Sequence, residues 1–527
     1  MSALEQLEEM LLQGKISRRQ FLTQVSALGL TAAVSSTFLS NPTSAATPKK
    51  GGRLRIGVND FGATDSLDPA LNETQFTMLL QYQLRNCLVE IGPGGKFVPE
   101  LAESWEGTPD AKTWTIQLRK GVEFHNGKTM DAEDVIYSMG LHIGKASRSV
   151  AHSFFKSVKR IVPTGKYTIK YELKSGDVDF PGILALFAVL IVPKGTTDFS
   201  DGMGTGPYIL DTFEPGVRSL VRRNPNYWKD GRGHFNEVEM QGISDVNART
   251  TAIISGSLDA MNHADVKTAH LLKKRSGIQV VRTAGKSHYE FVMNTSQPPF
   301  DNNHVRMALK LAIDRKDFLK RVLNGFGTLG NDHSLCPAYR YYADLPQRTY
   351  DPDKARWHMK QSGIGDHTFT IHASELPFSG AIDGSILYSE YAAKAGIKIK
   401  TVREPSDGFW TNVWRMKPFI TSRWSGRPTE DTMLSLAYGS ESTWNESYLN
   451  NPRLDTLLKM ARTEFDTQKR HQMYTECQQI IRDEGGTVVP VFADFVDVVS
   501  SKINFGERAS DWPLDGNRCS ERWWFDS

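Results

Sequence analysis

The feature that most constrains the fold of this chain is the mixing of strand-like and helix-like segments along most of its length. Polar and apolar side chains alternate over residues 53–58 and again over 114–118, which predicts two strands. Asp131 then stands where a helix N-cap is expected, shortly before the apolar Val135 and Ile136. The chain has no internal repeat and no low-complexity tract, so we predict a large α/β protein with intermixed elements.

The second half of the chain continues this mixture. Apolar residues at helical spacing over 305–313 predict a core helix, and Asp314 is expected to cap a second one. Apolar stripes over 454–465 and 473–481 predict another pair of helices. Residues 487–492 then have the pattern of a strand.

Size and charge exclude several classes of protein. A chain of 527 residues is expected to form three or four compact units, or two large lobes built from discontinuous segments. Its composition, with 39% hydrophobic and 23% charged residues, is typical of a folded globular protein. The 63 basic and 60 acidic side chains leave a net charge of +3, so nucleic acid is not expected as the main partner.

The cysteines are few and widely separated. They form no CxxC pair, so they indicate neither a zinc site nor a redox motif. We expect buried thiols, with one or two disulfides possible but not deducible from the spacing. The four residues are Cys87, Cys336, Cys477 and Cys519.

The amino-terminal segment has the order of an export signal. Arg18 and Arg19 precede an apolar run over residues 25–39, and the small residues 44–46 follow it as a cleavage pattern. The paired arginines resemble the signals of the Tat route, so we predict a signal peptide over 1–46; the alternative is an amphipathic helix with two surface arginines. The run has about 15 residues where a spanning helix needs about 20, which favours cleavage over anchoring.

Catalytic motifs are largely missing from the sequence. The 13 histidines contain no HExxH pair, and the chain has no GxSxG nucleophile elbow. Residues 121–129 approach a phosphate-binding loop but place five residues between its glycines, where the motif has four. Residues 202–206 lack the dinucleotide-binding spacing. We therefore predict no catalytic residues, no metal site and no cofactor.

Five separate groups of residues resemble one family, the large solute-binding proteins of ABC importers that include dipeptide, oligopeptide, nickel and opine binders. Their order and spacing match this family, bacterial extracellular solute-binding protein family 5, from about residue 50 to the end of the chain. Most of these residues are expected to identify the fold rather than the pocket. The groups are LAESW at 101–105, FHNG at 124–127 with AEDV at 132–135, GTGPY at 204–208, RRNPNYW at 222–228, and RMAL at 306–309 with AIDR at 312–315.

The resemblance implies a two-lobed periplasmic-binding-protein fold of the cluster C type, in which the lobes close on a solute in the cleft between them. Such a solute must contact both lobes in order to favour the closed form. By resemblance, the chain divides into a signal peptide at 1–46, lobe one at 47–92, 205–295 and 497–527, an inserted subdomain of lobe one at 93–204, and lobe two at 296–496.

The most informative candidate for the pocket is the stretch 424–431. It is similar to a family segment in which an aromatic residue, a small residue and a glycine, here Trp424, Ser425 and Gly426, lead to an aspartate that binds a peptide amine. That aspartate is replaced here by Arg427, which would repel an ammonium and favour a carboxylate or phosphate.

Other candidates for ligand contact are weaker. Glu430 matches a second acidic position of the family pattern, and it either binds the amine instead or pairs with Arg427. Thr64 and Asp65 follow the first strand and, by resemblance, face the cleft, although Asp65 is equally well explained as a turn residue. Arg423 and Trp444 flank the same region of lobe two, while Arg427 and Trp424 retain the alternatives of a solvated arginine and a core tryptophan.

Together these features predict a periplasmic substrate-binding protein of a peptide-type ABC transporter. It is expected to be a monomer without enzymatic activity, exported by the Tat translocase, that delivers a short peptide or peptide-like solute to an inner-membrane permease. An opine, a sugar-phosphate conjugate or another anionic solute is the main alternative. A Tat-exported periplasmic enzyme is the alternative of another class, and nickel carried as a chelate is a minor option.

Overall fold

The computed structural model describes residues 48–526. The predicted signal peptide at 1–46, with Arg18 and Arg19, lies outside the described residues. Between residues 48 and 526, no helix combines the length and the apolar character that crossing a bilayer requires.

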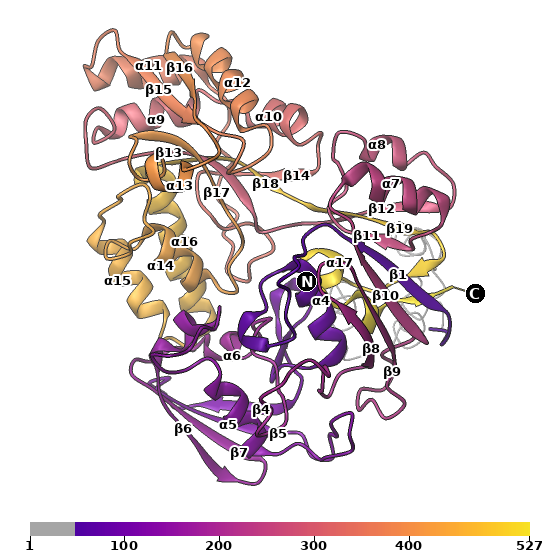
Figure 1. Cartoon of the computed structure of the whole chain (residues 1–527). Helices are drawn as coiled ribbons and strands as arrows, with labels where there is room; N and C mark the ends of the chain where they lie inside the picture. The colour runs from indigo at the N-terminus through magenta and orange to yellow at the C-terminus, as the bar shows by residue number, and fades with distance from the viewer. Residues whose placement is uncertain (1–47, 527) are drawn as a thin grey trace, which may run out of the picture. The chain divides into compact units, whose positions relative to one another are not determined.

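The first large sheet has seven strands in the order β12-β19-β11-β1-β10-β9-β8 (Figure 1). Its central strand β1 pairs in parallel with β10 and β11, and Leu54 and Ile56 of β1 are fully buried in the core. The strands are β1 (Arg53–Val58), β8 (Tyr208–Glu214), β9 (Arg218–Arg223), β10 (Glu237–Gly242), β11 (Ala260–Met261), β12 (Ile278–Thr283) and β19 (Phe495–Ser500). The helices of the same segments are α4 (Gln75–Leu84), α7 (Val246–Ser255) and α8 (Ala269–Leu272).

The second large sheet has six strands in the order β14-β18-β13-β17-β15-β16. They are β13 (His288–Met293), β14 (Gly327–Leu329), β15 (Thr368–Ala373), β16 (Lys398–Arg403), β17 (Phe419–Trp424) and β18 (Thr487–Ala493). The helices of this part are α9 (Asn303–Leu311), α10 (Arg315–Val322), α11 (Pro352–Ser362), α12 (Ala381–Ala393), α13 (Phe409–Asn412), α14 (Glu430–Tyr438), α15 (Pro452–Ala461) and α16 (Thr467–Glu484). Figure 1 shows α14, α15 and α16 together, away from α10 and α12.

A four-stranded antiparallel sheet, in the order β4-β5-β7-β6, has its own apolar core. Its strands are β4 (Ala102–Gly107), β5 (Thr113–Leu118), β6 (Val158–Gly165) and β7 (Thr168–Leu173), with helices α5 (Ala132–Gly140) and α6 (Phe180–Ile183) beside them in sequence. Two short pairs complete the strands: β2 (Val89–Ile91) with β3 (Phe97–Pro99), and β20 (Ile503–Asn504) with β21 (Trp524–Phe525).

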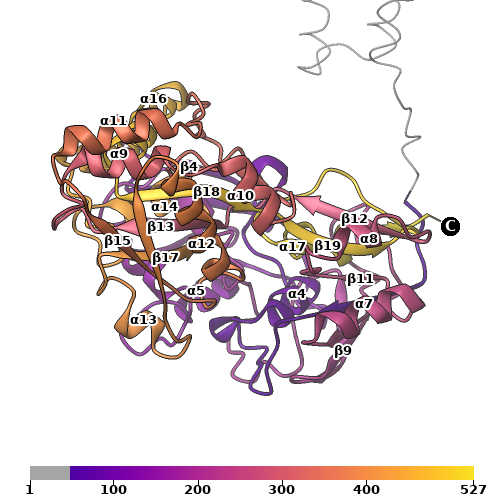
Figure 2. The same ribbon diagram turned by 90° about the horizontal axis from the view of Figure 1, so that it is seen from above.

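Among these strands, the chain passes twice between the two large sheets. The first crossing joins β12 to β13 and the second joins β18 to β19 (Figure 2). The crossings lie side by side, because Ala493 N donates to Ser287 O at 2.8 Å. A Cβ atom on Gly285 would lie 2.3 Å from Ala493 O, so only glycine permits this approach.

The predicted elements are found close to their expected positions. Strands occur over Arg53–Val58 and Thr113–Leu118, and Asp131 caps α5 in a capping box, which confirms the mixed α/β class. All four cysteines are buried and free. One detail is wrong: Phe465 was expected on the stripe of a core helix, but α15 ends at Ala461 and Phe465 is exposed, with one face against Trp114.

The chain enters the second large sheet with β13, before the predicted boundary after residue 295. β13 lies between β17 and β18, and its residues Phe291 and Met293 belong to the core of the second sheet. Strand alternation does not reveal which sheet a strand joins, so the sequence pattern could not locate this change. The division into lobes stays a prediction.

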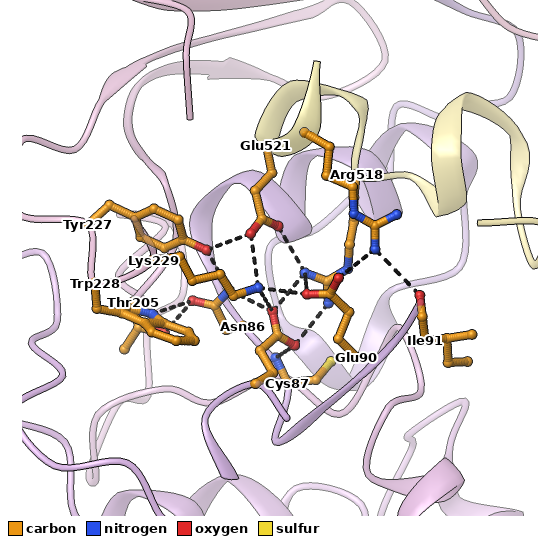
Figure 3. A network of polar contacts seen from close by, with 12 residues as sticks. Asn86, Cys87, Glu90, Ile91, Thr205, Tyr227, Trp228, Lys229, Arg518 and Glu521 are labelled. Carbon is orange, nitrogen blue, oxygen red and sulfur yellow. Dashed lines mark hydrogen bonds and ion pairs between the residues drawn. The ribbon is translucent and has the colours of Figure 1, made fainter. Parts of the chain in front are cut away.

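A buried network of charged side chains attaches the end of the chain to the first sheet's surroundings (Figure 3). Lys229 Nζ lies 2.7 Å from Glu90 Oε2, 3.0 Å from Glu100 Oε1 and 2.9 Å from Glu521 Oε1. Arg518 donates to Glu100 from both Nη1 and Nη2, at 2.7 and 3.0 Å. These three carboxylates lie close enough together to resemble a metal site, but Lys229 and Arg518 already satisfy them.

Family-like motifs contribute to the same network. Tyr227, from the RRNPNYW segment, donates its hydroxyl to Glu521 Oε1 at 2.9 Å. Thr205, from GTGPY, donates to Asn86 Oδ1 at 3.0 Å, and the indole of Trp228 also approaches that oxygen, at 3.3 Å (Figure 3). These motif residues therefore hold the fold together rather than form a pocket.

The tail that carries Arg518 also contains a left-handed turn. Within α17 (Pro513–Gly516), Leu514 and Asp515 have φ of 51° and 63°, and Asn517 just after it has φ of 62°. Such backbone is costly for residues other than glycine, so the surrounding structure must hold it in place. Asp497 Oδ2 does so by accepting from Leu514 N at 2.7 Å. The next helix, α18 (Cys519–Arg522), leads into the charged network.

Candidate functional site

A cavity of about 430 Å³ brings together three distant parts of the chain. One wall comes from residues around the four-stranded sheet, one from the loop between β17 and α14, and one from the tail before α17. The lining includes Leu186, Phe187, Lys286, Ser425, Gly426, Arg427, Trp444, Asp511 and Trp512.

The loop between β17 and α14 is shaped by local sequence. β17 ends at Trp424, and Thr429 caps α14 by accepting from Thr432 N at 3.2 Å. Between them, a Cβ atom on Gly426 would lie only 2.4 Å from Lys286 Cβ. Glycine at this position therefore allows the loop to pack directly against the first crossing between the sheets.

The guanidinium of Arg427 has no carboxylate partner among the described residues. Its Nη1 donates to the carbonyl oxygens of Ser425 at 3.0 Å and Gly426 at 3.3 Å, and the group lies over the ring of Trp424, 5.2 Å from its centroid. The loop is fixed below it, because Arg427 N donates to the hydroxyl of Tyr339 at 3.0 Å. Burial lowers the pKa of Arg427, but an arginine remains cationic at neutral pH.

Lys286 is a second cation that lines the same cavity as Arg427. Its side chain is buried, with 5% exposed, and its ammonium lies 4.4 Å from the centroid of the Tyr339 ring. Within residues 48–526 it forms no ion pair with a carboxylate. A buried cation held only by an aromatic ring is unusual, because buried charges are normally paired.

Asp511 adds a carboxylate on the tail side of the cavity. Its Oδ1 atom is buried without a hydrogen-bond partner among the described residues. Burial raises the pKa of Asp511, and the nearby Lys286 and Arg522 act in the opposite direction. The cavity wall thus carries two cations and one anion, with Asp511 near Lys286.

Four of the predicted contact residues line this cavity: Ser425, Gly426, Arg427 and Trp444. Trp424 and Arg423 instead line a second cavity of about 380 Å³, which adjoins the first because Ser425, Arg427 and Trp444 line both. Contact of these residues with a solute stays a prediction, but the sequence correctly grouped them around one loop.

Glu430 does not line either cavity and does not pair with Arg427. It is the first residue of α14 and is buried, and it accepts from Tyr341 N at 2.6 Å. Burial raises its pKa. The capping of α14 directs this side chain into the protein, so its position supports a structural role.

Thr64 and Asp65 also lie away from both cavities. Asp65 is a turn residue, as its alternative interpretation predicted: its N–H donates to Gly62 O at 3.0 Å, and its Oδ1 accepts from Thr74 Oγ1 at 3.0 Å. Burial raises the pKa of this carboxyl. Thr64 is exposed on the same turn.

Several cavity residues were missed by the sequence analysis. Lys286 and Asp511 are far in sequence from the 424–428 loop, and nothing in their local pattern distinguishes them from surface charges. The apolar residues Leu186 and Phe187 belong to a buried stretch that resembles ordinary core. Only the fold brings these residues together.

The family described as "Bacterial extracellular solute-binding proteins, family 5 Middle" matches residues 96–446, more than half of the chain. This chain belongs to the bacterial extracellular solute-binding proteins of family 5. The resemblance predicted from its motifs is therefore confirmed, and the protein is a solute-binding protein.

Individual relatives of this solute-binding protein are distant but cover most of its length. It is 25% identical to Di/tripeptide-binding protein 1 of Pseudomonas aeruginosa (strain UCBPP-PA14), over 79% of this chain and 82% of that protein. It is 26% identical to the glutathione-binding protein GsiB of Salmonella paratyphi A (strain ATCC 9150 / SARB42), over 76% of this chain and 82% of that protein.

A solved structure, HbpA2 from Haemophilus parasuis, shares the fold. Its TM-score with this solute-binding protein is 0.80 at 21% identity, covering 88% of this chain and 99% of that chain. The predicted two-lobed α/β fold of the family is confirmed by this similarity.

Proposed function

We propose that this solute-binding protein is the periplasmic substrate-binding component of a peptide-type ABC importer, and that it captures a short peptide or peptide-like solute bearing a carboxylate. The observation that carries the proposal is the pair of cations, Lys286 and Arg427, that line one cavity without a carboxylate partner among the described residues. An anionic group on the solute would supply that partner.

The chemistry of the two cations favours a carboxylate. The guanidinium of Arg427 offers a planar set of N–H donors that matches two carboxylate oxygens, and charge-assisted hydrogen bonds of this kind are among the strongest in proteins. Lys286 adds a second positive charge on the crossing between the sheets. Arg427 occupies the position at which the family pattern has an aspartate, which argues against binding of a peptide amine at this point.

Asp511, the carboxylate that lines the same cavity, is the candidate partner for the amine. Its carboxylate is partly buried and has an oxygen without a hydrogen-bond partner in the described chain. A zwitterion bound with its carboxylate at Arg427 and its ammonium toward Asp511 would give each of these two side chains an oppositely charged partner. This arrangement supports a peptide-like solute over a simple anion.

Size and position agree with this role. The cavity volume of about 430 Å³ falls in the range of sites for small molecules. Its walls come from both sides of the crossings between the sheets, so a bound solute would contact both and favour their closed arrangement. Relatives named for binding di- and tripeptides or glutathione support the same solute class.

An anionic solute without an amine, such as an opine or a sugar-phosphate conjugate, is the second candidate. Arg427 and Lys286 favour it as much as they favour a peptide, whereas Asp511 disfavours it. We further propose Tat-dependent export, function as a monomer with an inner-membrane permease, and the absence of catalysis; the predicted signal and the family relationship support these points.

Calorimetric titration with one tripeptide in three forms tests the proposal. The free acid should bind, the carboxyl-terminal amide should bind about 10–100-fold more weakly, and the amino-acetylated form should be weakened through the loss of its charge opposite Asp511. An opine and glutathione belong in the same series.

The matched variants are Arg427→Gln and Arg275→Gln, since Arg275 is an exposed arginine outside both cavities. Arg427→Gln should abolish the discrimination between acid and amide, and Arg275→Gln should keep it. Equal binding of the acid and the amide by the unmodified protein would exclude the proposed carboxylate site.

A further inference from the structure

Four tryptophans line the second cavity, next to the proposed solute site. They are Trp410 at α13, Trp414 just after it, Trp424 at the end of β17, and Trp444 in the segment after α14. The cavity measures about 380 Å³, and Ser422, Arg423, Ser425, Arg427 and Glu446 complete its wall.

The indole rings contact one another in a continuous series. Trp410 and Trp414 are 6.2 Å apart at an interplanar angle of 79°, and Trp414 and Trp444 are 6.0 Å apart at 71°. Trp424 and Trp444 follow at 5.9 Å and 51°. Edge-to-face geometry of this kind is what aromatic rings prefer, and an added ring can join it in the same way.

Two of these rings remain strongly exposed. Trp410 has 44% of its surface exposed and Trp444 has 50%. Large aromatic side chains normally bury most of their surface, and exposed apolar groups gathered at one place indicate an interaction site. Here they gather at a cavity rather than on an open face.

The carboxylate of Glu446 in the wall of this cavity is already occupied by two indole donors. Glu446 accepts a hydrogen bond from Trp414 Nε1 at 2.6 Å and another from Trp424 Nε1. Burial and the neighbouring Glu446 raise the pKa of the buried Glu290 well above its usual range. Both oxygens of Glu446 are used by the indoles, and the other charged groups in the wall are the cationic Arg423 and Arg427.

The second cavity adjoins the first. Ser425, Arg427 and Trp444 line both, and the Arg427 guanidinium lies over Trp424, 5.2 Å from the ring centroid. A solute whose carboxylate binds Arg427 would therefore place its neighbouring side chain at the tryptophans.

We propose that the cavity formed by Trp410, Trp414, Trp424 and Trp444 is a side-chain subsite for an aromatic ring of the bound solute. The inference rests on the proposed function and makes it more specific: the solute is a short peptide or peptide-like acid with an aromatic side chain. The ring would stack among the indoles, with the arginines near its faces.

Calorimetry with three dipeptides that differ in one side chain tests this subsite. Ala-Phe should bind at least about tenfold more tightly than Ala-Ala, because it buries a ring. It should also bind about 2–10-fold more tightly than Ala-cyclohexylalanine, which has similar bulk but no aromatic face. An N-acetylmuramyl dipeptide serves as a sugar-bearing fourth probe.

The decisive variant is Trp410→Ala, because Trp410 lines only the second cavity. It should bring Ala-Phe to within about twofold of Ala-Ala while leaving the binding of Ala-Ala unchanged, and Trp410→Phe should retain most of the preference. Trp357→Ala is the matched control, since Trp357 is 52% exposed and lies on α11, outside both cavities.

The outcomes separate the two proposals. An unchanged preference for Ala-Phe in Trp410→Ala, or a sugar probe that binds more tightly than Ala-Phe and depends on Trp410, would overturn the aromatic subsite and leave the carboxylate site standing. If the unmodified protein bound none of the free-acid dipeptides, the proposed function would fail, and this inference with it.

Discussion

Two groups of charged side chains in this protein differ in how their charges are balanced. In the network of Glu90, Glu100, Lys229, Arg518 and Glu521, every charged group has an oppositely charged partner within hydrogen-bond distance (Figure 3). In the first cavity, Lys286 and Arg427 have none among the described residues. Lys286 is as buried as the network, whereas Arg427 is only partly buried, so solvation does not explain the difference for Lys286.

The pKa shifts express the same contrast. Burial alone would raise the pKa of Glu90, yet Lys229, Arg518 and Arg522 together hold it well below its usual value. At Asp511 the effect of burial prevails and the pKa is raised. Complete charge pairing within the chain therefore indicates a structural role, and an unpaired charge in a cavity indicates a candidate ligand-binding group.

The largest expected effect comes from breaking the paired group. Arg518→Met removes the partner that donates two hydrogen bonds to Glu100 and should lower the free energy of unfolding by about 3–5 kcal/mol, because three buried carboxylates are then left with fewer cations. Urea unfolding followed by circular dichroism measures this loss. Arg427→Met, which removes an unpaired cation, should change stability far less; equal losses in the two variants would contradict the comparison.

A buried carboxylate without a cation partner should produce an opposite pH dependence. Burial raises the pKa of Asp497 from 3.8 to about 7, so its contribution to stability is full below about pH 4 and is lost as the pH rises through 7. Asp497→Asn keeps an acceptor for Leu514 N without the charge. The difference in the free energy of unfolding between the variant and the unmodified protein should rise by about 1–3 kcal/mol from pH 5 to pH 8.

Unfolding curves at the two pH values measure this difference. A gain that is independent of pH would assign the effect to packing rather than to titration of Asp497.

A smaller effect is expected from a substitution in the loop between β17 and α14, where it contacts the first crossing. Gly426→Ala places a Cβ atom 2.4 Å from Lys286 Cβ, so Lys286 or the loop must move. The strain should cost about 1–3 kcal/mol, divided between weaker binding of a free-acid peptide and lower stability. Gly140→Ala is the control, because no atom lies within 4 Å of its added Cβ. Calorimetry and thermal unfolding of both variants measure the two parts.

The smallest effect is expected at an exposed ion pair. Arg160 Nη2 lies 2.5 Å from Glu172 Oε1 at the surface of the four-stranded sheet. Exposed pairs add little because water solvates each charge equally well, so Arg160→Gln should leave the unfolding midpoint unchanged. A clear destabilisation would show that pairing matters here regardless of burial.

Local patterns in the sequence were sufficient for much of the fold. The strand at 53–58 and the capping of α5 by Asp131 depend on neighbouring residues, and the structure places both as expected. Phe465 was misplaced because the apolar stripe continues past the end of α15 at Ala461. The pairing of β13 with β17 could not be predicted from the sequence because it is non-local.

Only some residues of the candidate site could be predicted from the sequence. Gly426 and Arg427 could be found because they belong to one loop with a family-like pattern. Lys286 and Asp511 could not, since each contributes through its place in three dimensions. Glu430 is the buried first residue of α14 and lies outside both cavities, which its local sequence did not reveal. The series of tryptophans joins residues from several elements, so no single segment indicated it.

The position of Lys286 on a connection between the sheets has a mechanical consequence. Its neighbour Ser287 is hydrogen-bonded to Ala493 on the second connection, so the two strands form one short pivot. A group on a pivot hardly changes place when the bodies on either side rotate, whereas distant walls swing through wide arcs. If a solute binds Lys286 as proposed, that contact would therefore change little during closure of the lobes, while contacts farther from the pivot form.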